Sequence, residues 1–140
     1  MHFCKTMIQY KTGDNDMNIT EFLNEYAKSI IIKEVDGEYD LTLPFRLFND
    51  ESVITLHIKE NQGGYFDIDD KGNTLRYLNN LNTNLQDYKD RVEIICQLFS
   101  LKIEDNLVKG VIGYGNNQLF KQLNNFLQGI SHLSTIKYFC

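Results

Sequence analysis

The segment with the clearest chemical potential in this chain lies at residues 69–71. Asp69, Asp70 and Lys71 are consecutive there, so that Asp69 and Lys71 form a D-x-K triplet. In metal-dependent nucleases of this pattern, carboxylates hold Mg²⁺ and a lysine stabilises the charge that develops at the attacked phosphate. Asp50 can supply a carboxylate from a second element. On this interpretation the chain is a Mg²⁺-dependent nuclease or phosphodiesterase that uses Asp50, Asp69 and Lys71.

Turn chemistry explains the same segment without catalysis, and we favour that interpretation. Aspartate is common where turns begin, Gly72 accepts a positive φ, and Asn73 or Thr74 can cap a following helix. Asp67 alternates with apolar neighbours and should face solvent. The carboxylates would then belong to a surface that binds a partner. The candidate partner-binding residues are Glu60, Tyr65, Asp67, Asp69 and Asp70.

No other motif predicts catalysis, a metal or a cofactor. His57 lies on a predicted strand without a visible nucleophile, so we expect a structural histidine that is exposed or half-buried. Gly110, Gly113 and Gly115 precede a helix but lack the lysine of a phosphate-binding loop, which favours a turning loop. The three cysteines at 4, 96 and 140 are too far apart for zinc spacing.

Two consecutive hairpins must position the 69–71 segment. Asp36-Gly37 and the Gly63-Gly64 pair are turn signals between alternating apolar runs, which predicts four antiparallel strands. Helical periodicity precedes and follows these strands. We therefore expect an α+β fold in which the four-stranded antiparallel sheet packs against about four helices. A second, small hairpin is expected near 100–112. Residues 1–17 are predicted to be an N-terminal arm, and residues 18–140 a single domain.

Composition narrows the classes of partner. The net charge is −5 and the pI is about 5.1, which argues against direct binding of nucleic acid. That charge suits docking on a protein with a basic, nucleic-acid-binding surface, and it is also ordinary for a domain of this size. No apolar run predicts a membrane span. Sparse cysteines indicate a reducing compartment, the cytoplasm of a bacterial host.

Several short motifs resemble a family of small bacterial and prophage proteins, domain-of-unknown-function family eighteen twenty-eight. The resemblance covers roughly residues 18–136. It rests on Leu43-Pro44-Phe45, Asp50, Gly63-Gly64-Tyr65 and the stretch from Asp69 to Leu75. Lys71 is an insertion relative to the family pattern. The resemblance implies a phage or mobile-element setting, and it brings no established catalytic residues.

Small size, acidity and the absence of a catalytic constellation together favour a binding function. We expect a protein-binding module from a phage or mobile element that inhibits a host defence component, such as a CRISPR effector, by direct non-enzymatic binding. The nuclease that would use Asp50, Asp69 and Lys71 is the alternative.

Overall fold

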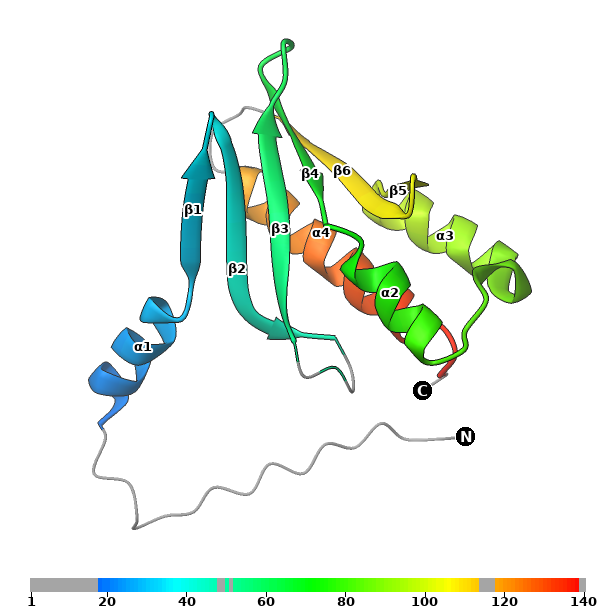
Figure 1. The fold of residues 1–140 in the computed structure, drawn as a ribbon, viewed down its shortest axis with the longest axis horizontal. Helices are drawn as coiled ribbons and strands as arrows, with labels where there is room; N and C mark the ends of the chain where they lie inside the picture. Colours follow the sequence, from blue (N-terminus) through cyan, green and yellow to red (C-terminus); the bar gives the residue numbers. More distant parts are fainter. Residues whose placement is uncertain (1–17, 48–49, 51, 114–117, 139–140) are drawn as a thin grey trace.

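The protein has an α+β fold with one antiparallel sheet and helices packed against it (Figure 1). The computed structural model describes residues 18–47, 50, 52–113 and 118–138. The strands are β1 (Ile31–Val35), β2 (Glu38–Arg46), β3 (Val53–Glu60), β4 (Tyr65–Asp69), β5 (Lys102–Glu104) and β6 (Leu107–Gly113). The helices are α1 (Ile19–Lys28), α2 (Asn73–Asn80), α3 (Lys89–Phe99) and α4 (Gln118–Ser134), with a 3₁₀ turn at Leu85–Tyr88.

Within the described ranges the sheet has six strands in the order β1-β2-β3-β4-β6-β5, and every neighbouring pair is antiparallel. The α+β class and the two consecutive hairpins are confirmed. The expected count of four strands is wrong, because the small hairpin near 100–112 does not stand apart. Its second strand, β6, pairs with the free edge of β4 and extends the same sheet.

Tight turns of favourable sequence fix the hairpins. Asp36 and Gly37 form the two-residue β1–β2 turn, and both have positive φ. Asp105 and Asn106 do the same between β5 and β6. At the β3–β4 turn, the Asn61 Oδ1 atom accepts hydrogen bonds from the Gly63 and Tyr65 amides at 3.0 and 3.1 Å. These turns set which residues lie opposite each other in the paired strands.

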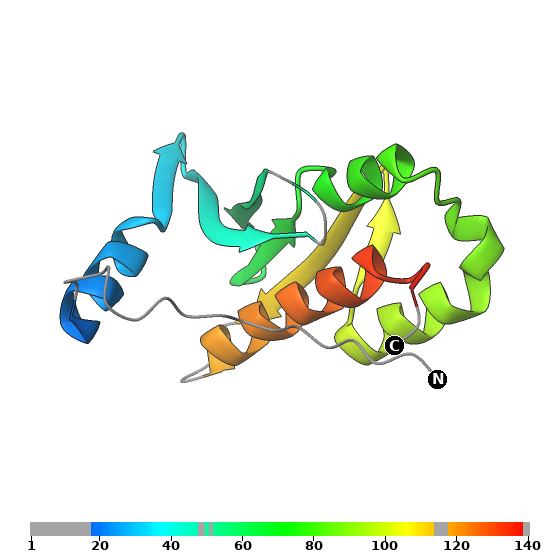
Figure 2. The ribbon, with the colours of Figure 1, turned by 90° about the horizontal axis from the view of Figure 1, so that it is seen from below.

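Alternation along the strands gives the sheet two different faces. On the inner face, Ile54, Leu56 and Ile68 are at most 2% exposed and pack in one core with Phe126, Ile130 and Leu133 of α4. Figure 2 shows α4 running across this face with α3 beside it. The opposite, outer face carries polar residues at the positions between, as expected for a sheet with one buried side.

Pro44 lies inside β2, where the pairing with the neighbouring strands is incomplete. The β1 ladder stops at the Ile31–Thr42 pair, and the β2–β3 register shifts between Leu43 and Arg46. Proline has no amide hydrogen, and it lies here where the strand pairing requires no hydrogen-bond donor.

Gly110 allows α4 to approach the sheet closely. A Cβ atom at this position would lie 2.7 Å from the Phe126 ring of α4, which is closer than real side chains allow. This part of the glycine run therefore serves packing, while Gly115 lies outside the described residues. The same is true of the predicted arm at 1–17 and of two cysteines, at 4 and 140. No helix in the described part of the chain is long and apolar enough to cross a bilayer.

Candidate functional site

Asp70 is fully buried, and its carboxylate ties three segments together. It follows β4 directly and is 0% exposed. Its Oδ1 atom accepts hydrogen bonds from the amides of Gly72 (3.0 Å) and Val108 (3.1 Å), and its Oδ2 atom accepts one from Thr74 (2.9 Å). Asp70 therefore caps the start of α2 and links it to β6. The structure therefore places this partner-binding candidate in the interior, where its side chain does not reach the surface.

The three residues of the nuclease interpretation bind three different groups. The Asp69 Oδ1 atom accepts a hydrogen bond from the Lys71 amide at 2.8 Å, which closes the turn. The Lys71 Nζ atom lies 3.1 Å from Asp40 Oδ2, on β2. Asp50 pairs instead with Arg76 of α2, at 3.1 Å. The structure thus does not bring Asp50 to the Asp69–Lys71 turn as a shared ligand set. Among the described residues, no group of three or more His, Cys, Asp or Glu side chains is placed to hold a metal ion.

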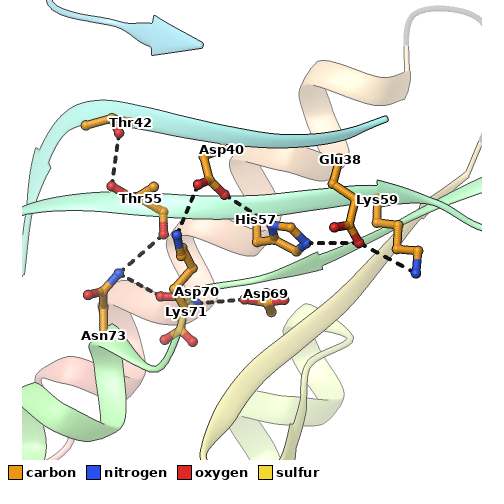
Figure 3. A network of polar contacts seen from close by, with 10 residues as sticks. All are labelled: Glu38, Asp40, Thr42, Thr55, His57, Lys59, Asp69, Asp70, Lys71 and Asn73. Atoms are coloured by element: carbon orange, nitrogen blue, oxygen red, sulfur yellow. Dashed lines mark hydrogen bonds and ion pairs between the residues drawn. The ribbon is translucent and has the colours of Figure 1, made fainter. Parts of the chain in front are cut away.

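His57 lies at the centre of a polar network on the outer face of β2 and β3 (Figure 3). The β2–β3 register places Asp40 opposite His57 and Glu38 opposite Lys59. The His57 Nδ1 atom is 3.1 Å from Asp40 Oδ1, and its Nε2 atom is 3.6 Å from Glu38 Oε1. The sequence predicted a structural histidine that is exposed or half-buried, and His57 is half-buried, with two carboxylate partners that the sequence did not indicate.

These contacts favour the charged forms of both partners. The hydrogen bond to Asp40 raises the pKa of His57 above 6.5, against a smaller opposing effect of burial. Hydrogen bonds from His57 and Lys71 lower the pKa of Asp40 below 3.8. Both ring nitrogens of His57 face carboxylates, an arrangement that suits an imidazolium and not the neutral ring that a general base requires.

A hollow of about 500 Å³ lies on the outer face beside this network. It extends from β3 across β4 and β6 to the start of β5. Its charged and titratable lining residues carry both signs: His57, Lys59, Asp67, Asp69, Lys102 and Lys109. Of the sequence candidates, Asp67 and Asp69 therefore line one hollow. The lysines of β5 and β6 were missed, because only the pairing of β4 with β6 brings them there.

Exposed apolar groups border the hollow. Val111 lies opposite Asp67 in the β4–β6 ladder and is 60% exposed. Tyr65 is 50% exposed, and its ring lies over Gly113, where a Cβ atom would be 2.9 Å from Tyr65 Cε1. Glu60 is exposed at the end of β3, near the β3–β4 turn. The Asn61 side chain donates a hydrogen bond to Asp67 at 3.1 Å, so residues close in the sequence position this carboxylate.

Comparisons with family models, with curated proteins and with solved structures found no match for this chain. The resemblance to family eighteen twenty-eight stays a prediction from its motifs.

Proposed function

We propose that this protein is a non-enzymatic protein-binding module that binds its partner on the outer face of the sheet, around β4 and β6. One observation carries the proposal: a charged hollow of about 500 Å³ lies next to the exposed side chains of Tyr65 and Val111. Interface centres are enriched in tyrosine, and polar groups commonly surround the apolar contact.

The geometry around Tyr65 favours binding with little loss of side-chain freedom. Its ring occupies the space that Gly113 leaves open, so the neighbouring strand already restricts its position. A side chain that is ordered before binding costs less entropy when the complex forms. Tyr65 and Val111 would make the apolar contacts, and the charge of Asp67 would fix the position of the partner on this surface.

The partner should carry charges of both signs. Asp67 and Asp69 share the hollow with Lys59, Lys102 and Lys109, so this part of the surface is not purely acidic. The carboxylates would pair with basic groups of the partner, as the acidic composition suggested, while the lysines would meet acidic groups. Such mixed complementarity contributes more to specificity and association rate than to affinity.

Inhibition of a host defence component is the narrower form of this proposal. Small size, a net charge of −5 and the motif resemblance to a prophage family support it. Co-expression with candidate defence systems, followed by phage infection, tests this form. A phage titre that is unchanged for every system would leave the general binding function without the anti-defence role.

Affinity capture from the native cells tests the binding surface itself. The bait proteins are the unaltered chain, a Val111→Arg variant and a Gln97→Arg variant. Both variants add one positive charge at an exposed site, but Gln97 lies on α3 and is not one of the residues that line the hollow. The proposal is supported if the unaltered chain and Gln97→Arg both capture a partner and Val111→Arg recovers at least tenfold less of it. Equal recovery with all three baits places the partner elsewhere on the protein.

A further inference from the structure

An apolar surface at the β1 edge of the sheet lies apart from the hollow. Its side chains come from α1 and β1, and we call it the α1–β1 surface. Seven large apolar side chains make up this surface: Ile19, Phe22, Leu23, Tyr26, Ile31, Ile32 and Val35. Each is between 53% and 69% exposed. Helix α1 buries no residue, and every residue of β1 is exposed. A patch of this kind on a protein surface usually marks an interaction site.

Helix α1 needs a packing partner to be stable. It is ten residues long, and an isolated helix shorter than about 12–15 residues is marginal in water. The Asn18 cap supplies one hydrogen bond, from the Glu21 amide at 2.9 Å, which is a modest contribution. Most helical stability in proteins comes from burying the apolar face, and the described part of this chain does not bury it. The occupant of this surface must therefore be present whenever the helix is formed.

The two edge strands of the sheet differ in how well they are protected against pairing with another chain. At the far edge, β5 is three residues long and presents Lys102 and Glu104, which protects it from pairing. At the near edge, β1 is five residues long and mostly apolar and β-branched, and no other described strand pairs with its outer backbone groups. Proteins seldom leave such an edge open to solvent. Strand pairing at β1 would satisfy these groups.

We propose that a second copy of this chain covers the α1–β1 surface, with the two β1 strands paired antiparallel about a twofold axis at Ile32. In this register Ile32 faces its own counterpart, and Lys33 faces the partner's Ile31. Registers centred on Lys33 or Glu34 would instead place like charges opposite each other, which is unfavourable. The result is one continuous sheet with the strands of both copies.

The position of α1 agrees with this arrangement. The helix leans away from its own sheet, on the side of β1 opposite β2 (Figure 1). A twofold axis at Ile32 brings the β1–β2 turn of the second copy to that side. The apolar face of α1 would then pack on the second copy, and the contact would close on itself without forming filaments.

The available area is sufficient for a stable dimer. With ~150–200 Å² for each fully exposed side chain of this size, the seven residues offer on the order of 700 Å² per protomer. Standard interfaces bury about 800 Å² per partner, and the β1 backbone adds to the side-chain area. A second copy is also an occupant that is present wherever the chain folds.

Sedimentation equilibrium of the purified full chain tests the proposal. The chain mass is 16.4 kDa, and we expect twice this mass for the unaltered protein at micromolar concentration. Ile32→Lys places like charges face to face and should yield the monomer mass. Val111→Lys is the matched control, since it adds the same charge at an equally exposed strand residue on the far side of the sheet, and it should remain dimeric.

Hydrogen exchange of the unaltered protein keeps the proposal testable if Ile32→Lys fails to fold. The β1 amides should exchange at least tenfold more slowly at micromolar than at nanomolar concentration, because dimer formation protects the free edge. A monomer mass at 100 µM, a dimer that persists in Ile32→Lys, a mass above the dimer, or β1 exchange that does not depend on concentration would each overturn the proposal. None of these outcomes bears on the hollow on the outer face, so the dimer proposal and the proposed binding function can fail independently of each other.

Discussion

Replacing Asp70 should destabilise the fold more than any other change at the acidic turn. The side chain is 0% exposed and accepts three backbone hydrogen bonds, from Gly72, Thr74 and Val108. Asp70→Ala removes both acceptor oxygens, and with them all three hydrogen bonds, and leaves the buried Val108 amide without its partner. A hydrogen bond to a charged group contributes about 1.5–3 kcal/mol, and loss of a helix cap costs ~1 kcal/mol. Adding about 1.5–3 kcal/mol for the Val108 bond to about 1 kcal/mol for the cap of α2, we expect a loss of about 2.5–4 kcal/mol in the free energy of unfolding.

That loss is large beside the ~5–15 kcal/mol of a typical domain. Urea unfolding followed by circular dichroism, at one fixed protein concentration, measures it as a shift of the midpoint. Asp69→Ala is the matched control, since Asp69 makes a single turn hydrogen bond to the Lys71 amide at the surface, and it should cost less than about 1 kcal/mol. Asp70→Asn keeps the shape but presents an amide to one of the backbone donors, so it should fall between the two. A midpoint for Asp70→Ala within error of Asp69→Ala would refute the reasoning.

Three further outcomes follow from the contacts described. The charged pair of His57 and Asp40 should stabilise the fold fully between about pH 4 and 6.5. Above pH 6.5 this contribution falls, because His57 loses its proton as the pH passes its raised pKa. Below pH 4 it falls because Asp40 is protonated. His57→Gln should therefore flatten the loss of stability between pH 6.5 and 9 in thermal unfolding curves, and an unchanged slope would contradict the pairing. Gly110→Ala should cost about 1–3 kcal/mol because its Cβ would meet the Phe126 ring, and Phe126→Leu in the same chain should recover part of that loss in urea unfolding. Purified protein incubated with DNA or RNA and Mg²⁺ or Mn²⁺ should show no cleavage; cleavage abolished by Asp69→Ala and by Lys71→Ala would restore the nuclease interpretation.

The features that could be predicted from the sequence are the local ones. The positive φ of Asp36 and Gly37 follows from residue type at a two-residue turn, and strand alternation separated Leu56 from His57 correctly. The pairing of β4 with β6 joins residues 40 to 48 positions apart, and nothing in either strand specifies that partner. This is why the number of strands was wrong.

The candidate site shows the same limit at the level of single side chains. Asp69 and Asp70 are adjacent and chemically identical, so local sequence suggested similar exposure for both. The Val108 amide, contributed by β6, draws only Asp70 into the interior. In the same way, His57 gained its carboxylate partners through the β2–β3 register, which the sequence of neither strand specifies alone.

The placement of α4 has a consequence for how the chain is made. The strands β1 to β4 are complete by Asp69, yet the helix that covers their inner face ends only at Ser134. At ~5–20 residues per second, the ribosome needs roughly 3–13 s to add the intervening 65 residues. During that interval the apolar side chains of Ile54, Leu56 and Ile68 lack their final cover. The nascent chain would therefore depend on the ribosome surface or a chaperone to shield this face, and slow codons between β4 and α4 would lower its soluble yield.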